Sequence, residues 1–368
     1  MARRTERDGS DNVIPFPRRP DGARDSLHGD QTAAVLKSGW LTQGSQARLL
    51  EGEAAQLLGT PNVVPVAGGA VALHLALLAL ELAHDDEVVL PSLASPALAN
   101  LIVLAGGRPV FAEIIAPEAP VIDPDDVARQ ITASTRAIVC SHTGGYPAPA
   151  HALAELAAER GVVLIEECWQ ALGASIEGSA VGTIGRLGVF ALQRSPDGGG
   201  FVACADDALR RRIQDLRSSA ARPNGEGFEH DFEVILANGY RINEASAAAG
   251  VRSLRHLPQT IQERQAIVET MRQRAGQGVS LAFAPGYLDE AEPSYKSLLL
   301  LVDSSERLHE IVRRARVARV GFAIPAAMHR LPPHNAHLPR VSLPKTEACC
   351  ARAIELAVDD ELLALDLT

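Results

Sequence analysis

The most informative segment of the chain is residues 163–201, VLIEECWQALGASIEGSAVGTIGRLGVFALQRSPDGGGF. It starts with an apolar run that is typical of a buried strand, and this run leads directly into two carboxylates, Glu166 and Glu167. A glycine-punctuated stretch then leads to a second apolar run at 187–192 and to three glycines. Open α/β sheets bind ligands just beyond the ends of buried strands, so this segment predicts a ligand site as well as a sheet.

Outward from this segment, strand-like and helix-like patterns alternate along the chain. Apolar strand segments are predicted at 63–67, 87–90, 109–113, 137–141 and 162–165, and helical patterns at 70–83, 95–105, 123–131 and 151–160. The strands at 137–141 and 162–165 lack period-two alternation, as expected for strands buried on both faces. The pattern predicts the α/β class with a mainly parallel central sheet.

The rest of the chain predicts three regions. Residues 1–24 combine prolines and charges, which favours a disordered arm. We expect a large domain at 25–257 and a smaller α+β C-terminal domain at 258–368. In the second of these we predict strands at 294–302 and 320–324, and helices at 258–277, 305–316 and 346–357.

Composition narrows the functional classes. The chain has 368 residues and a net charge of −10, which argues against nucleic-acid binding. We expect no membrane span and no secretory signal, because no long apolar run occurs, and we therefore expect a cytoplasmic protein. The five cysteines lack zinc spacing, and His329, His334 and His337 lack helical spacing, so no metal is expected.

Seven segments in order resemble one known family. They are LKSGWLTQG (36–44), VALHLALLAL (71–80), DDEVVLPSLAS (85–95), GGRPVFAEI (106–114), TRAIVCSHTGGYPA (135–148), VLIEECWQALGA (163–174) and NGYRINEASAAAG (238–250). Together they resemble the DegT/DnrJ/EryC1/StrS sugar aminotransferases, over roughly residues 33–356. The resemblance implies a PLP-transferase fold of type I and a homodimer whose active sites lie between two subunits. It also implies pyridoxal phosphate (PLP) held as a Schiff base by a lysine.

The lysine that this resemblance implies is absent from its expected place. The segment after the 187–192 strand reads Gln-Arg-Ser-Pro-Asp at 193–197, and the chain contains only Lys37, Lys296 and Lys345. Arg194 cannot form the Schiff base, because its guanidinium stays protonated.

Other positions also depart from the family pattern. The positions that by resemblance would contact the cofactor, but carry other residues, are Gly68, Ala70, Ser95, Glu167, Trp169, Ala191 and Gly239. The positions that match the family are Gln170, Tyr240, Arg241 and His329. From these changes we predict that PLP is not bound, although the backbone at Gly69 and Ala70 could still hold an anion.

Two sets of candidate residues follow. The candidate catalytic residues are Glu167, Cys168, His142, Arg194 and Tyr240, and the candidate ligand-binding residues are Gly69, Ala70, Ser95, Trp169, Gln170, Arg241 and His329. Cys168 is either a nucleophile paired with His142 or an inert core thiol. Trp169 is either a packing residue or a stacking platform for a ligand ring.

Three hypotheses on function remain open. The first is a degenerate sugar-aminotransferase-like protein, a pseudoenzyme or PLP-independent enzyme of natural-product or sugar biosynthesis that binds a small molecule such as a nucleotide sugar. The second is a non-catalytic subunit that forms a heteromer with an active homologue. The third is a conventional PLP-dependent sugar aminotransferase that uses Lys37 or Lys296.

Overall fold

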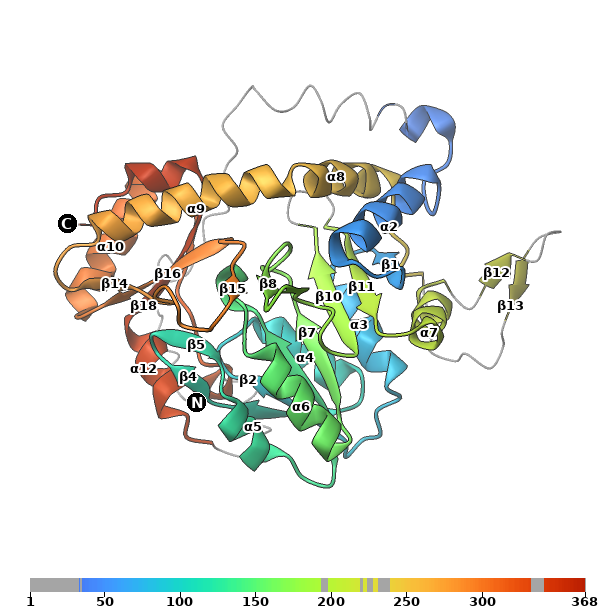
Figure 1. The fold of residues 1–368 in the computed structure, drawn as a ribbon, viewed down its shortest axis with the longest axis horizontal. Helices are drawn as coiled ribbons and strands as arrows, with labels where there is room; N and C mark the ends of the chain where they lie inside the picture. Colours follow the sequence, from blue (N-terminus) through green and yellow to red (C-terminus); the bar gives the residue numbers. More distant parts are fainter. Residues whose placement is uncertain are drawn as a thin grey trace, which may run out of the picture.

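A seven-stranded sheet forms the centre of the larger part of the molecule, which we call the large domain (Figure 1). The structure is a computed structural model and describes residues 33, 35–192, 198–218, 221–223, 228–230, 239–331 and 341–367. The strand order is β1-β11-β10-β7-β6-β2-β3, with strands at Val63–Val66, Gly200–Cys204, Leu187–Ala191, Val163–Glu167, Thr135–Ser141, Glu87–Pro91 and Arg108–Ala112. The pairs from β10 to β3 are parallel, and β11 runs antiparallel to both β10 and β1. The predicted mainly parallel α/β sheet is therefore confirmed.

Helices cover both faces of this sheet, which explains the apolar runs in its strands. One face packs against α3 (Gly69–Ala79), α4 (Pro96–Leu104) and α7 (Asp207–Arg217). The other face packs against α5 (Pro124–Gln130), α6 (Ala150–Arg160), α2 (Ser45–Leu58) and α8 (Glu244–Arg255). Alternate residues of one strand enter opposite layers: Val64 joins the first and Val63 the second. This two-sided burial is what a parallel sheet requires.

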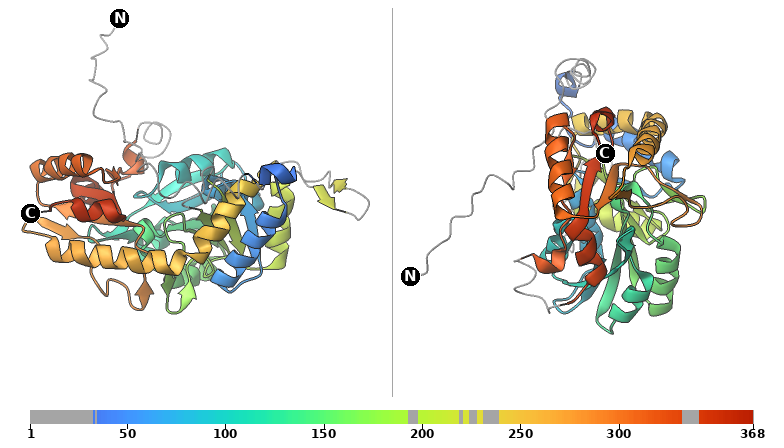
Figure 2. Two further views of the ribbon diagram at one scale, coloured as in Figure 1. Left: turned by 90° about the horizontal axis from the view of Figure 1, so that it is seen from above. Right: turned by 90° about the vertical axis from the view of Figure 1, so that its left-hand side faces the viewer.

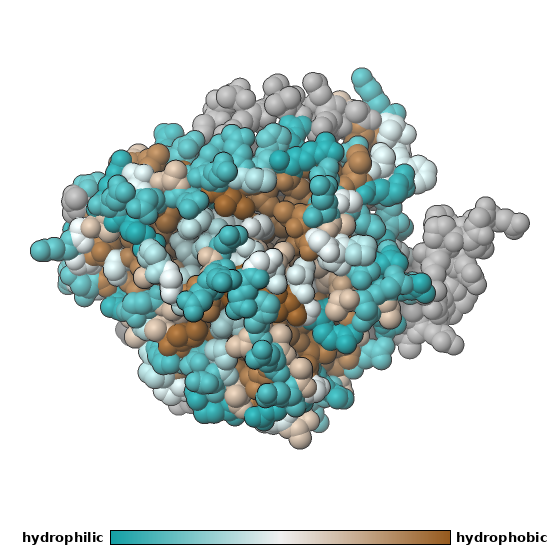
Figure 3. Space-filling view, in the orientation of Figure 1, coloured by the Kyte–Doolittle hydropathy of each residue, from teal (hydrophilic) through white to brown (hydrophobic). Residues whose placement is uncertain are grey.

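A second sheet organises the smaller part of the molecule, which we call the small domain. Its antiparallel strands have the order β14-β16-β18-β17, at Val279–Leu281, Ser297–Val302, Ala353–Ala357 and Phe322–Ala323. Helix α9 (Leu257–Arg274) runs from the large domain along the small domain (Figure 2). Helices α10 (Ser305–Ala318) and α12 (Pro344–Arg352) pack against β16 and against each other. The outer side of α9 is mostly hydrophilic (Figure 3), and no described helix is long and apolar enough to cross a membrane.

The remaining short elements lie outside these two sheets. They are β4 (Ile114–Ala116), β5 (Ala119–Ile122), β8 (Ser175–Ile176), β9 (Ser179–Ala180), β12 (Ala221–Pro223), β13 (Phe228–His230), β15 (Ala291–Glu292) and the 3-10 turns η1 (Thr143–Gly145), η2 (Met328–Arg330) and η3 (Asp360–Ala364).

One predicted element is wrong, and two predicted regions are not described. The helix expected at 346–357 ends at Arg352, and residues 353–357 form β18 between β16 and β17. The alanine- and leucine-rich sequence suits a helix locally, but pairing with β16 on one side and β17 on the other overrides this preference. The arm at 1–24 and residues 193–197 lie outside the described residues.

A buried carboxylate from α8 fixes the start of α2. Helix α2 has Gly44 at its N-cap, which offers no side-chain acceptor. Glu244, only 3% exposed, instead accepts backbone hydrogen bonds from Gly44 at 2.7 Å, Gln46 at 2.8 Å and Ala47 at 3.1 Å. The carboxylate thereby satisfies the amide groups that a helix start leaves unpaired.

We therefore expect Glu244→Gln to destabilise the protein by about 2 kcal/mol, because an amide N–H₂ would face backbone donors in a buried position. Urea unfolding measures this change. The matched control is Glu263→Gln on the exposed face of α9, which should change the free energy of unfolding by less than about 0.5 kcal/mol. Equal effects of the two substitutions would contradict this account of α2.

Candidate functional site

Three segments meet at the carboxyl end of the central sheet. They are the end of β7, the end of β10 and the start of α3. A Cβ atom placed on Gly69 would lie 2.8 Å from Ala191 Cβ and 3.0 Å from Trp169 Nε1, so only glycine fits there without displacement of a neighbour. No side chain caps α3, whose N-cap is Gly68. Its first backbone N–H groups therefore provide a place for an anion.

Glu167 is the buried carboxyl group of this site. It ends β7, accepts a hydrogen bond from Trp169 N at 2.8 Å, and accepts a second from the Ser141 hydroxyl at the end of β6. Burial raises the pKa of this carboxyl above its ordinary value, while the two hydrogen bonds oppose the increase. The group is thus held in a defined position in a weakly polar environment.

Glu166 points to the other face of the sheet, as alternation along a strand requires. It accepts backbone hydrogen bonds from Gly182, Ile184 and Gly185 at 2.6–2.8 Å. His142 contacts it at 3.2 Å through Nε2. Because His142 Nδ1 accepts from Ala148 N, the donor proton is assigned to Nε2. Glu166 and His142 therefore join the segments 182–185 and 142–148 to the end of β7.

The proposed pairing of Cys168 with His142 is not formed. Both nitrogens of His142 have other partners, and Cys168 Sγ lies 3.7 Å from Glu166 O within the apolar core. Burial raises the pKa of Cys168 well above its ordinary value, and the nearby glutamates raise it further. The thiol is therefore protonated and packed, which fits the inert alternative.

Gln170 connects the site to the small domain. Its Oε1 accepts from Gly144 N at 2.8 Å, and its Nε2 donates to Glu355 on β18 at 2.7 Å. Ser297 donates its hydroxyl to the same Glu355 oxygen at 2.6 Å, and the charge of Glu355 raises the pKa of Glu167. The sequence prediction missed Ser141, Ser297 and Glu355, because their partners are distant in the sequence and become neighbours only when strands pair or, for Gln170 and Glu355, when the two domains meet.

The remaining candidates occupy different surroundings. The Tyr240 hydroxyl lies 3.4 Å from His74 Nδ1 on α3, and burial lowers the pKa of that imidazole, which favours its neutral form. Arg241 is exposed, and Ser95 caps α4 by accepting from Ala97 N. Ala70 is exposed at the start of α3.

His329 belongs to a separate buried contact: its Nδ1 lies 2.7 Å from Ser92 Oγ and its Nε2 3.0 Å from Glu347. Arg194, His334 and His337 lie outside the described residues. Within the described parts of the chain, no cluster of three or more metal-ligating side chains occurs.

The architecture is that of PLP-dependent aminotransferases. The crystal structure of an aminotransferase from Streptoalloteichus hindustanus superposes with a TM-score of 0.83 at 29% identity, and the match covers 92% of this chain and 93% of that one. The chain belongs to the DegT/DnrJ/EryC1/StrS aminotransferase family, which matches residues 25–367.

Two relatives are enzymes of related activity. A dTDP-4-dehydro-2,3,6-trideoxy-D-glucose 4-aminotransferase from Saccharopolyspora spinosa is 31% identical over 90% of this chain and 89% of its own length. An L-glutamine:2-deoxy-scyllo-inosose aminotransferase from Streptomyces kanamyceticus is 34% identical over 66% of this chain and 59% of its own.

These findings overturn the prediction that the protein has lost PLP and transamination. The main hypothesis of a PLP-independent protein or pseudoenzyme is wrong, since the relatives are named aminotransferases along nearly the whole chain. The error has a physical cause. Gly68 and Ala70 lack the side-chain hydroxyls that the family pattern has there, but the backbone N–H groups of α3 remain, and Glu167 keeps a buried carboxyl at the end of β7.

The residues present fit two of the groups that PLP carries. The uncapped start of α3 suits a phosphate, and the Glu167 carboxyl suits a pyridine nitrogen. The amine must come from outside 193–197, which holds no lysine. Lys345, in α12, forms an ion pair with Asp123 at 3.3 Å. Lys37 and Lys296 are the two lysines that the sequence hypothesis names for this role.

Glu167→Gln should change how the stability of the cofactor-free protein depends on pH. The folded-state pKa of Glu167 is raised above 4.5, so its favourable contribution is complete below that pH and is lost as the pH rises through the folded-state value. Glutamine does not titrate, so the stability of the variant does not fall in this way as the pH rises. Its stability relative to the unmodified protein should therefore increase from pH 4.5 upward, as urea unfolding at several pH values would measure. A constant difference would contradict the raised pKa.

Proposed function

We propose that this protein is a PLP-dependent aminotransferase that converts a ketone carbon of a sugar or cyclitol into an amine. The observation that carries the proposal is the convergence of Glu167 and the uncapped start of α3 at the carboxyl end of the sheet. Support comes from the names of the two relatives, which act on a nucleotide-linked keto sugar and on a cyclitol ketone. Natural-product or sugar biosynthesis is the setting that we propose.

Each group of residues in the site has its own role. The α3 backbone amides hold an anionic phosphate, and Glu167 orients a ring nitrogen by a hydrogen bond or charge. Gln170 keeps the η1 turn and β18 in place around that ring. PLP, when bound, supplies an electron sink that the protein's own side chains lack.

Titration with PLP tests the proposal directly. We expect a new visible absorption band, a higher melting temperature, and attachment of the cofactor to Lys37 or Lys296 after borohydride reduction, as located by peptide mass spectrometry. Because the chain contains only three lysines, Lys37→Arg, Lys296→Arg and Lys345→Arg form a complete set. One of the first two should abolish the reduced adduct.

Lys345→Arg is the internal control of this set and should retain the adduct. Glu167→Ala should weaken PLP binding at least tenfold, because it removes the carboxyl at the ring nitrogen. A spectrum and a melting temperature that PLP leaves unchanged would overturn the proposed function.

We also propose a homodimer. Apolar side chains gather, exposed, around the N-terminal side of α2: Leu36 (65%), Trp40 (63%), Leu41 (53%) and Leu49 (46%). A cluster of exposed apolar side chains on the surface of one subunit is typical of a protein interface. This segment also contacts the start of α8, since Leu41 O accepts from Glu244 N, and so it lies close to Tyr240 and Arg241.

Leu41→Glu should therefore shift the protein from dimer to monomer, because it places a charge within the proposed apolar interface. Size-exclusion chromatography with light scattering at micromolar protein measures the mass. The matched control is Val317→Glu on α10, whose side chain is 82% exposed and lies in the small domain. A monomeric unmodified protein, or dissociation by the control as well, would refute this interface.

A further inference from the structure

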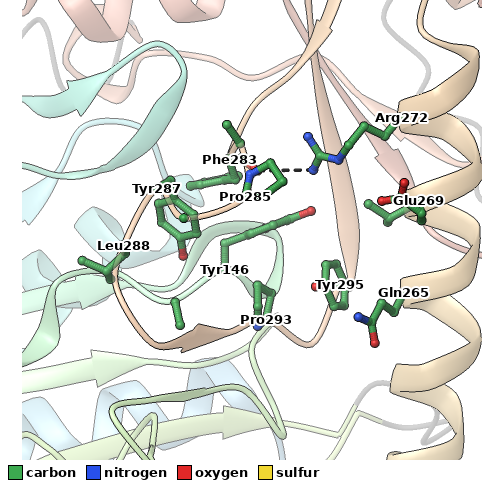
Figure 4. A pocket seen from close by; sticks show the side chains of 14 residues that line it. Tyr146, Gln265, Glu269, Arg272, Phe283, Pro285, Tyr287, Leu288, Pro293 and Tyr295 are labelled. Carbon is green, nitrogen blue, oxygen red and sulfur yellow. Dashed lines mark hydrogen bonds between the residues drawn. The ribbon is translucent and has the colours of Figure 1, made fainter.

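A cavity of about 300 Å³ lies between α9 and the segment 283–295, apart from Glu167 and the start of α3 (Figure 4). Its walls are unusually aromatic: Tyr146, Phe283, Tyr287 and Tyr295 all line it. Phe283 and Tyr295 both adopt positive φ angles, at 58° and 51°, which non-glycine residues rarely do. The surrounding structure thus holds both rings in place at a local conformational cost.

Tyr146 contributes a buried donor without an acceptor. Its side chain stacks on Phe283 with ring centroids 4.3 Å apart, and the residue is only 2% exposed. Its hydroxyl is buried and has no hydrogen-bond partner in the described part of the chain. Burial raises the pKa of this phenol, so it keeps its proton at neutral pH. The neighbouring Tyr287 differs, because its hydroxyl donates to Pro147 O at 2.7 Å.

Arg272 places positive charge beside this donor. In Figure 4 the hydroxyl of Tyr146 points toward α9, from which Arg272 and Glu269 project. Arg272 makes a hydrogen bond of 3.4 Å to Phe283 O, and no ion pair of Arg272 occurs among the described residues. Its charge acts to lower the pKa of Tyr146, which indicates that the two groups are close. Glu269 accepts from Gln273 and adds one negative charge at the rim.

We propose that this cavity binds an aromatic monocarboxylate, whose carboxylate accepts the hydrogen bond of Tyr146 and faces Arg272. The orphan hydroxyl requires an acceptor, and the guanidinium favours an acceptor that carries negative charge. The rings and prolines of the wall suit a flat apolar body. Glu269 disfavours a doubly charged phosphate by like-charge repulsion. The volume matches a small molecule at the lower end of the range for ligand pockets.

Calorimetric titration of the full chain with sodium benzoate tests the proposal. Benzoate should bind at millimolar concentration or better. Acetate, benzylamine and inorganic phosphate should each bind at least about tenfold more weakly. Acetate lacks the ring, benzylamine is positively charged, and phosphate carries a second negative charge. Tyr146→Phe and Arg272→Gln should each weaken benzoate binding about tenfold or more, because each removes one partner of a charged acceptor.

Tyr287→Phe is the matched control, because it removes a hydroxyl from the same cavity whose hydrogen bond is already satisfied. It should leave benzoate affinity within threefold. Tyr146→Phe should keep or raise the melting temperature, since it removes an unpaired buried hydroxyl, and this shows that the variant is folded. The proposal would be overturned if benzoate failed to bind. It would also be overturned if Tyr146→Phe and Arg272→Gln bound benzoate as tightly as the unmodified protein, or if benzylamine bound as tightly as benzoate.

Discussion

The carboxylate of Glu166 fixes the geometry on which the active-site region depends. It is fully buried, yet it accepts three backbone hydrogen bonds from the loop at 182–185 and contacts His142. A buried carboxylate without such partners would be prohibitively unfavourable, so the loop and the strand end specify each other. Because successive strand residues face opposite sides, anchoring Glu166 directs Glu167 toward the start of α3.

Buried carboxylates that accept backbone hydrogen bonds also join other distant parts of the chain. Glu113 accepts from Lys345 N and Thr346 N, each at 2.8 Å, and so holds the start of α12 against the large domain. Glu244 does the same for α2. In each case a single acidic side chain satisfies several amides that the local chain leaves unpaired. Exposed ion pairs contribute little to stability. These buried carboxylates therefore do more to fix the relative positions of segments than the same number of exposed ion pairs would.

Much of the fold follows from the sequence, because each parallel strand contains an apolar run and the segments between the strands have helical patterns. The terminal strand β18 was mispredicted because its sequence favours a helix and only β16 and β17 make it a strand. Ser141 and Glu355 could not be assigned, since their neighbours belong to distant segments. The prediction that PLP is lost failed for a related reason: it judged binding by side chains alone, although the uncapped start of α3 keeps its backbone N–H groups.

One turn connects the two sites. Gly144 N donates to Gln170, Gly145 O accepts from Ser294 N, and the next residue is Tyr146, whose ring enters the aromatic cavity. Gly145 has a φ of 88°, and a Cβ on it would lie 2.6 Å from Ser294 Oγ, so only glycine fits where the turn meets segment 294–297. A displacement of Tyr146 would therefore have to move Gln170 or the segment at 294–297, which carries Ser297 and reaches Glu355. The cavity and the Glu167 site are thus mechanically linked through a turn that tolerates little distortion.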